Sequence, residues 1–286
     1  MLTLALMVAA SFAQEPGDFP EMNTNLYRVP IDAAMTLWTD DAGRAPNRYV
    51  TGRVAANYLN NPLTVVDYYG DTYRVVADAL SLDLLGGVTF GPMRFGVDLP
   101  VYLLSSSDYE QLGGAGLGDL SVDVKGTVLD PREYALGLAL AGRVQLPTST
   151  VDLPLGDPAV RWDLRLIADK RFGDLLVAAN LGTQGGPPVE AQNLDLNDAF
   201  LYRVGAGYAL SKRAGVSVDV GGQFSYSTPL SDAAGSPVEA MLGVWGRVAE
   251  SVVIRGGVGT GLNQGIGAPA LHAVAMVSYE PPFARD

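Results

Sequence analysis

The sequence lacks cysteine, has a single histidine and contains few long apolar runs, although 48% of its 286 residues are hydrophobic. The absence of cysteine excludes a disulfide scaffold and thiolate metal sites. After the first residues, nothing approaches the roughly 18 consecutive apolar residues that a membrane-spanning helix requires. If this chain meets a bilayer, it must therefore cross it as β-strands.

Basic residues are also scarce, with 19 Lys and Arg against 31 Asp and Glu and a formal net charge of −12. Nucleic acid binding needs clustered basic residues against the phosphates, and no such stripe occurs. The glycine-rich stretches GAGLGD and GGVGTGLNQG lie at expected strand ends without a following helix, so they do not predict phosphate binding. We expect no nucleic acid partner, no cofactor and no metal site.

The N-terminal stretch MLTLALMVAASFAQEP has the features of a signal peptide. Leu2 to Ala10 is a short apolar core, and Ser11-Phe12-Ala13 places small residues at the cleavage positions. We expect residues 1–13 to be removed after export; the alternative is a buried N-terminal segment. Residues 14–48 are irregular, acidic and interrupted by proline, and we expect them in the periplasm. Their one apolar run, Ala34 to Trp38, predicts either an extra strand or a plug at the periplasmic mouth of a barrel.

Strict alternation of apolar and polar residues defines the rest of the chain, most clearly in LGDLSVDVKGTV, residues 117–128. Leu120, Val122, Val124 and Val128 fall on one face of an expected strand, and Asp119, Ser121, Asp123, Lys125 and Thr127 fall on the other. Such a strand fits a soluble core with its charges in water. It equally fits a barrel wall with its apolar face against lipid and its charges in the lumen.

The spacing of the strands favours the barrel. We expect about twelve strands between residues 49 and 280, with 281–286 as a tail, and long and short connections alternate throughout, the stretch 60–73 being one of the long ones. Short periplasmic turns opposite long external loops are typical of outer-membrane barrels, and strands of about ten residues match the bilayer thickness. The predicted fold is an all-β, antiparallel transmembrane β-barrel in the outer membrane.

Two sets of side chains follow from this assignment. Charged residues on the inward face predict a salt-bridged lumen, because unpaired charges in a narrow lumen are costly: Arg53, Asp83, Arg94, Asp98, Asp119, Asp123, Lys125, Arg143, Arg161, Asp163, Arg165, Asp169, Arg203, Asp219, Glu239, Arg247 and Arg255. Aromatic residues predict two interfacial girdles: Tyr58, Trp162, Phe200, Tyr202, Phe224 and Tyr226 near the external rim, and Tyr134, Tyr208 and Tyr279 near the periplasmic rim. Glycines such as Gly205, Gly207, Gly257 and Gly259 are expected to leave room for water.

Several phrases of the sequence resemble the N-terminal barrel of a group of OmpA-family outer-membrane proteins. They include NTNLYRVP, ANYLNNPLTVVD, RFGVDLPVYL, GAGLGDLSVDVK, ALAGRVQLPT and GGVGTGLNQGIGAP, and the resemblance covers about Asn23 to Pro282. In that group the barrel is usually followed by Asp-rich repeats and a peptidoglycan-binding domain. This sequence stops at Asp286, so the resemblance does not extend to peptidoglycan binding. It implies partners in outer-membrane lipid and in the machinery that inserts barrels.

The remaining acidic residues gather in the expected external loops, among them Asp67, Asp71, Asp108, Glu110, Asp152, Asp157, Glu190, Asp195, Asp198 and Asp232. They serve solubility or bridge divalent cations to anionic surface glycolipid. His272 is expected at the external rim without a catalytic partner, so no enzymatic activity is predicted. Three functions remain open: a structural, porin-like barrel with a charge-paired lumen, a narrow passive channel or transporter for small solutes, and a soluble β-rich binding protein.

Overall fold

The computed structural model describes residues 22–30, 32–66, 69–109, 112–186, 188–191, 194–196, 198–226 and 233–280. The expected signal peptide, residues 1–13, and the expected tail, 281–286, lie outside the described residues. Within the described ranges, no helix is long and apolar enough to cross a membrane.

The barrel wall consists of β1 (Val50–Val66), β2 (Thr72–Phe90), β3 (Met93–Ser106), β5 (Ser121–Leu129), β6 (Gly137–Gln145), β7 (Arg161–Phe172), β8 (Leu175–Gly185), β11 (Ala199–Ser211), β12 (Ala214–Ser225), β13 (Val238–Ala249), β14 (Val252–Gly261) and β15 (Leu271–Tyr279). Three short strands lie in the connections: β4 (Gly116–Leu117), β9 (Val189–Ala191) and β10 (Leu194–Leu196).

Each wall strand pairs antiparallel with its neighbour in the chain, and the pairing of β1 with β15 closes the sheet. The sheet counts 13 strands because β4 is attached to the edge of β3, so 12 strands form the closed wall. A closed sheet leaves no unpaired edge, which a bilayer requires of any β-structure that spans it. The prediction of an all-β antiparallel barrel with about twelve strands is confirmed.

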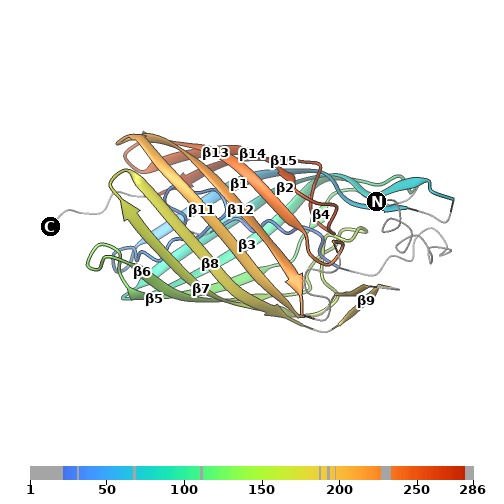
Figure 1. Ribbon diagram of the computed structural model, residues 1–286, viewed down its shortest axis with the longest axis horizontal. Helices are drawn as coiled ribbons and strands as arrows, with labels where there is room; N and C mark the ends of the chain where they lie inside the picture. The colour runs from blue at the N-terminus through green and yellow to red at the C-terminus, as the bar shows by residue number, and fades with distance from the viewer. Residues whose placement is uncertain are drawn as a thin grey trace.

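The connections differ between the two ends of the barrel, as Figure 1 shows. One end, called the short-turn end, carries tight turns such as those at Gly91 and Gly173, whose φ angles of 58° and 60° are in the region that glycine adopts without strain. The other end, called the long-connection end, carries the stretches 107–120, 146–160 and 262–270. The predicted alternation of long and short connections is therefore present.

The two faces of the wall have opposite character. Leu140, Leu166 and Leu181 stand in one cross-strand row over β6, β7 and β8. All three are exposed on the outside, at 59%, 47% and 44% of their surface. Asp123 and Arg165, by contrast, are buried inside. The wall therefore turns its apolar side outward, the reverse of a soluble barrel, as the alternation predicted.

The stretch 60–73 is not a loop. β1 continues to Val66 and β2 begins at Thr72, and the two strands stay paired with irregular register between Asn60 and Thr64. This hairpin extends beyond the wall at the long-connection end, visible in Figure 1 as the longest projection there. Its polar residues and the proline at 62 suggested a loop, but Leu63 pairs with Val76 and Val65 pairs with Tyr73 across the hairpin, so both strands are extended.

The seam between β1 and β15 is closed by charge as well as by backbone pairing. Glu280, directly after β15, accepts from Arg255 of β14 at 2.8 Å and from Arg53 of β1 at 3.2 Å. Arg53 and Arg255 also donate to the hydroxyl of Ser278. Burial opposes the ionisation of Glu280, but Arg255 and Arg53 outweigh it and hold the pKa of this carboxyl below its ordinary value.

A substitution to arginine on the outer face tests whether that face of the wall contacts hydrocarbon. Leu166→Arg places a charge in the middle of β7 and should lower the free energy of unfolding from lipid vesicles by about 2–4 kcal/mol. The matched control Val66→Arg, at the projecting hairpin, should have little effect. Urea titrations of the two variants measure the difference, and equal stabilities would mean that hydrocarbon does not cover Leu166.

The seam predicts a pH dependence. The lowered pKa of Glu280 stabilises the folded barrel above the ordinary glutamate pKa of about 4.3, and this contribution disappears as the pH falls through the folded value. Glu280→Gln should cost about 2–3 kcal/mol at neutral pH. The difference from the unsubstituted chain should shrink in acid, followed by urea unfolding at a series of pH values. Glu133→Gln, an exposed carboxylate at the same end, is the control, and a pH-independent cost at position 280 would contradict the assignment.

Candidate functional site: the lumen and the segment inside it

Residues 22–47, here called the inner segment, run through the lumen. At the long-connection end the Thr24 hydroxyl donates to the carbonyl of Pro154 at 2.7 Å. At the short-turn end Arg44 forms an ion pair with Asp130 at 3.3 Å. The segment therefore spans the barrel from one mouth to the other, and its described part forms no strand of the wall. The sequence left open an extra strand or a plug at the periplasmic mouth; these contacts place the described part of the segment along the inside of the barrel.

One side of the lumen is apolar and packs against the inner segment. Tyr27, Val29, Leu37 and Trp38 are buried against wall residues of β1, β2, β13 and β15, namely Ala55, Leu85, Met241, Val274 and Met276. The sequence pattern did not reveal this patch, because these wall positions were read as the inward, polar face. Burying them inside the barrel requires apolar partners, and the run Ala34 to Trp38 provides part of them.

Asp219 of β12 holds the backbone of the inner segment in place at residues 37–39. Its carboxylate accepts the backbone N–H groups of Leu37 at 3.0 Å, Trp38 at 3.4 Å and Thr39 at 3.0 Å. It also accepts the Thr39 hydroxyl at 2.7 Å. These four donors stabilise the buried carboxylate of Asp219, which forms no ion pair with a described cation. They also determine where the backbone of residues 37–39 lies.

Asp40 fastens the next residues to the opposite side of the wall. Its carboxylate pairs with Arg165 of β7 at 2.7 Å. Its backbone is held by Asn180 of β8 through two reciprocal hydrogen bonds, of 2.8 Å to the side-chain oxygen and 2.9 Å from the side-chain amide. Arg165 in turn binds Asp123 of β5 at 2.6 Å, so the inner segment is part of the charge network of the wall.

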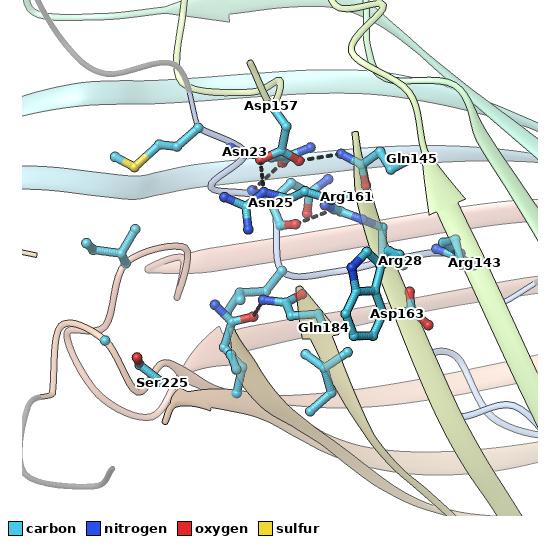
Figure 2. A pocket seen from close by; sticks show the side chains of 18 of the residues that line it. Asn23, Asn25, Arg28, Arg143, Gln145, Asp157, Arg161, Asp163, Gln184 and Ser225 are labelled. Atoms are coloured by element: carbon cyan, nitrogen blue, oxygen red, sulfur yellow. Dashed lines mark hydrogen bonds and ion pairs between the residues drawn. The ribbon is translucent and has the colours of Figure 1, made fainter. Parts of the chain in front are cut away.

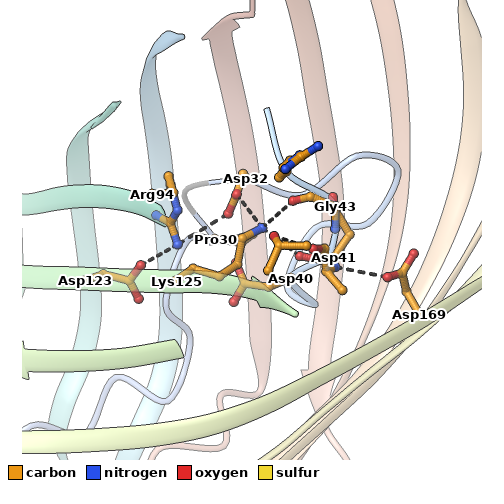
Figure 3. A network of polar contacts seen from close by, with 12 residues as sticks. Pro30, Asp32, Asp40, Asp41, Gly43, Arg94, Asp123, Lys125 and Asp169 are labelled. Carbon is orange, nitrogen blue, oxygen red and sulfur yellow. Dashed lines mark hydrogen bonds and ion pairs between the residues drawn. The ribbon is translucent and has the colours of Figure 1, made fainter. Parts of the chain in front are cut away.

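Figure 3 shows this network continuing toward the short-turn end. Asp123 also pairs with Arg94 of β3, and Lys125 binds Asp32 of the inner segment at 2.6 Å. The Lys125 ammonium donates to the carbonyls of Asp41 and Gly43 at 2.9 Å each. The inner segment therefore neutralises and solvates Lys125, just as its Asp40 neutralises Arg165.

The structure buries most of the residues expected to line the lumen: Arg53, Asp83, Arg94, Asp98, Asp119, Asp123, Lys125, Arg143, Arg165, Asp169, Arg203, Asp219, Glu239 and Arg255. Arg161, Asp163 and Arg247 are partly buried. These residues were expected to pair with one another within the wall. Several of the cations instead form ion pairs with Asp32, Asp40 and Glu280, which lie outside the wall strands. Sequence reasoning missed these partners. The only signal for them was the group of aspartates flanking the run Ala34 to Trp38.

Three of the four glycines expected to leave room for water make room for the inner segment, whereas a Cβ at Gly259 would meet Met241 Cγ of β13 at 2.7 Å. A Cβ atom at Gly207 would lie 2.6 Å from the Cβ of Met35, and one at Gly257 would lie 2.2 Å from Leu37 Cδ1. A Cβ at Gly205 would meet the Thr39 hydroxyl at 2.6 Å. The glycine positions thus mark the path of the inner segment along β11 and β14.

His272 is the second residue of β15, near the long-connection end, but its ring is enclosed rather than exposed at the mouth. It is fully buried, and its Nδ1 and Nε2 atoms contact Glu239 and Asn57 at 2.5 Å each. The ring of Tyr27 from the inner segment packs edge-on against it with centroids 4.8 Å apart. Both ring nitrogens are occupied, so neither is free to activate a serine hydroxyl.

The predicted girdle residues lie at the two ends of the wall. Trp162 and Tyr226 are exposed at the long-connection end, where Tyr58, Phe200, Tyr202 and Phe224 are half-buried. Phe200 and Phe224 stack with ring centroids 5.0 Å apart. Tyr134, Tyr208 and Tyr279 are exposed at the short-turn end.

Among the described residues, no group of three or more carboxylate or imidazole side chains is placed to hold a metal ion. Asp108 pairs with Arg74 at 2.6 Å. Asp157, expected on an external loop, is buried and pairs with Arg161 at 2.7 Å. Burial raises the pKa of Asp157, although Arg161 opposes this shift. Asp67, Glu110 and Asp232 lie outside the described residues.

Two of the cavities beside the inner segment lie at opposite ends of the lumen. The first, of about 100 Å³, lies at the long-connection end between the segment and β6, β7, β8 and β11, and Figure 2 shows its side chains converging from wall and segment. The second, of about 340 Å³, lies at the short-turn end and is lined by residues such as Asp32, Arg94 and Glu280. No residue lines both cavities. The inner segment contributes residues between 22 and 28 to the first cavity and residues between 32 and 45 to the second.

Searches against protein-family models and curated proteins find no match for this chain. Solved structures do match its fold. An outer-membrane channel of the COG4313 group from Pseudomonas putida F1 has a TM-score of 0.62 at 13% identity, over 84% of this chain and 97% of that chain. The NanC porin has a TM-score of 0.56 at 6% identity, over 81% of this chain and 100% of that chain. At these identities the likeness shows the fold alone: the structural neighbours of this chain are outer-membrane β-barrel channels and porins.

Proposed function

We propose that this chain is a porin-like protein of the outer membrane, a passive channel for small solutes whose lumen is restricted by its own inner segment. The observation that supports this proposal most is the inverted wall, with leucine and valine outside and paired charges inside. Water can wet only the inside of such a barrel, while hydrocarbon suits the outside. The location is further supported by its structural neighbours, which are outer-membrane channels and porins.

Passage requires movement of the inner segment. The two cavities are separate, and the contacts of Asp219 and Asp40 hold the segment between them. The segment is nevertheless a single extended chain without wall pairing, so releasing it breaks side-chain contacts and leaves the sheet intact. We infer that the closed and conducting forms differ in the position of residues 34–42.

A structural scaffold is the second candidate. The many contacts that hold the inner segment favour this candidate, because a scaffold has no need to empty its lumen. The third alternative, a soluble binding protein, lacks support because exposed leucines such as Leu140 and Leu166 cover the outside of the wall.

The finer predictions from sequence stay predictions. These are the OmpA-type relationship, insertion by the barrel-assembly machinery, contact with outer-membrane lipid, divalent cations at acidic external loops, and the absence of enzymatic activity. A barrel of about 8 strands, the OmpA size, is filled by side chains alone. The 12 strands found in this wall enclose a lumen wide enough for the inner segment.

Removing the anchor of the inner segment tests the channel. Asp219→Ala eliminates four acceptor contacts, each worth about 1.5–3 kcal/mol to a charged group. Loss of a single contact of this strength already shifts the equilibrium between the closed and open forms by about tenfold, so we expect the mean conductance in planar lipid bilayers to rise by at least about tenfold. The control Asp108→Asn also removes one negative charge, but at an exposed site beside Arg74 of the projecting hairpin. It should conduct like the unsubstituted chain.

The outcomes separate the two candidates. Small, occasional unitary currents that become frequent in Asp219→Ala support a channel with a movable segment. Silence in both proteins, with folding verified by anomalous migration of unboiled samples on gels, supports the scaffold and overturns the channel.

A further inference from the structure

The cavity at the long-connection end has an excess of arginine. Arg28 of the inner segment, Arg143 of β6, Arg161 of β7 and Arg203 of β11 all line it, against the two carboxylates Asp157 and Asp163. Figure 2 shows Arg28, Arg143 and Arg161 directed toward the same space.

Both carboxylates of the cavity already have a cation. Asp157 binds Arg161 at 2.7 Å, and Asp163 binds Arg165, which lies deeper in the lumen, at 2.6 Å. They therefore do not neutralise the other three arginines. Among the residues that line the cavity, arginines therefore outnumber carboxylates, while Asp123, which does not line it, lies 3.7 Å from Arg143.

The contacts of these three arginines are incomplete. Arg203 is 93% buried, lies over the ring of Trp38 at 5.5 Å, and its Nη1 has no hydrogen-bond acceptor. Arg143 is 96% buried, approaches Asp123 only to 3.7 Å, and its Nε has no acceptor. Arg28 donates to the backbone carbonyls of Asn25 and Tyr27 and forms no ion pair with a described carboxylate. Buried guanidinium groups without acceptors are costly, so such donors normally face a ligand or an anion.

Amide groups occupy the opposite side of the cavity. Gln184 of β8 donates to Gln223 of β12 at 2.7 Å, and the carbonyl of Gln184 and the amide N–H groups of Gln223 make no hydrogen bond to another described residue. Amides of this kind donate to and accept from hydroxyl groups. With about 100 Å³, the space holds roughly seven water molecules, or one small organic ion in their place.

We propose that this cavity is a binding site for a small hydroxylated carboxylate, with the carboxylate against Arg143 and Arg203 and the hydroxyls against Gln184 and Gln223. The planar guanidinium fork matches a carboxylate in two parallel hydrogen bonds. Arg28 adds positive charge on the side of the inner segment. This inference rests on the proposed function. It names the class of solute that enters the lumen from the long-connection end.

The test uses the full chain, folded in detergent micelles, and isothermal titration with sodium gluconate. Sorbitol has the same hydroxyl groups without the carboxylate and is the matched control ligand. We expect saturable binding of gluconate and none of sorbitol. Inorganic phosphate is the third probe; if it binds as tightly as gluconate, the amides contribute nothing and the assignment to a hydroxylated carboxylate is overturned.

Variants locate the site. Arg143→Gln and Arg203→Gln should each weaken gluconate binding by at least about tenfold, since each removes one charged pair. Arg203→Lys keeps the charge but loses the fork and should weaken it less. Arg74→Gln, which removes an arginine on the exposed hairpin side, should bind normally. Equal affinity in all four variants would overturn the proposal.

Two further results keep the test decisive. If a variant does not fold, as judged by gel migration, the comparison of gluconate with sorbitol on the unsubstituted chain still decides whether the carboxylate is recognised. Titration also does not depend on conductance. Binding without currents would retain this site and overturn the channel, whereas currents without gluconate binding would retain the channel and overturn the site.

Discussion

Charge pairing inside the lumen is the interaction on which the rest of this structure depends. A wall that turns its apolar side outward must place its charged residues in a confined interior, where an isolated charge is expensive. Asp123 shows how the cost is met, because it lies among Arg94, Arg143 and Arg165 from three neighbouring strands. Backbone pairing alone would close the sheet, but the register of those strands is what brings these four side chains together.

The inner segment completes what the wall leaves unpaired. Asp32 and Asp40 supply carboxylates to Lys125 and Arg165, and the carbonyls of residues 41 and 43 solvate the same lysine. In return, Asp219 satisfies the backbone donors of residues 37–39. Wall and segment are therefore mutually dependent: neither satisfies its own polar groups, and together they satisfy most of them.

The lumen is asymmetric, and this asymmetry determines where a solute can lie. Tyr27, Leu37 and Trp38 attach the segment to an apolar side formed by β1, β2, β13 and β15. At the long-connection end the remaining space is displaced toward β6, β7, β8 and β11, where arginines outnumber carboxylates. The mouth at the short-turn end has the same bias, with Arg44, Arg53, Arg94, Arg132, Arg171 and Arg247 against Asp32, Asp41 and Glu280. An anionic solute would meet a favourable potential at either mouth.

The sequence by itself determined the wall. Alternation with a period of two is a local property, so it shows which side of each strand is apolar and where each strand turns without knowledge of its neighbours. It did not determine the hairpin at residues 60–73, the contacts of His272 or the role of Gly207 and Gly257. Only the tertiary structure decided the path of the inner segment, because its contacts join residues as distant as Leu37 and Asp219, 182 positions apart. No local pattern encodes such pairs; they arise when the closed wall brings distant polar and apolar groups into one enclosed space.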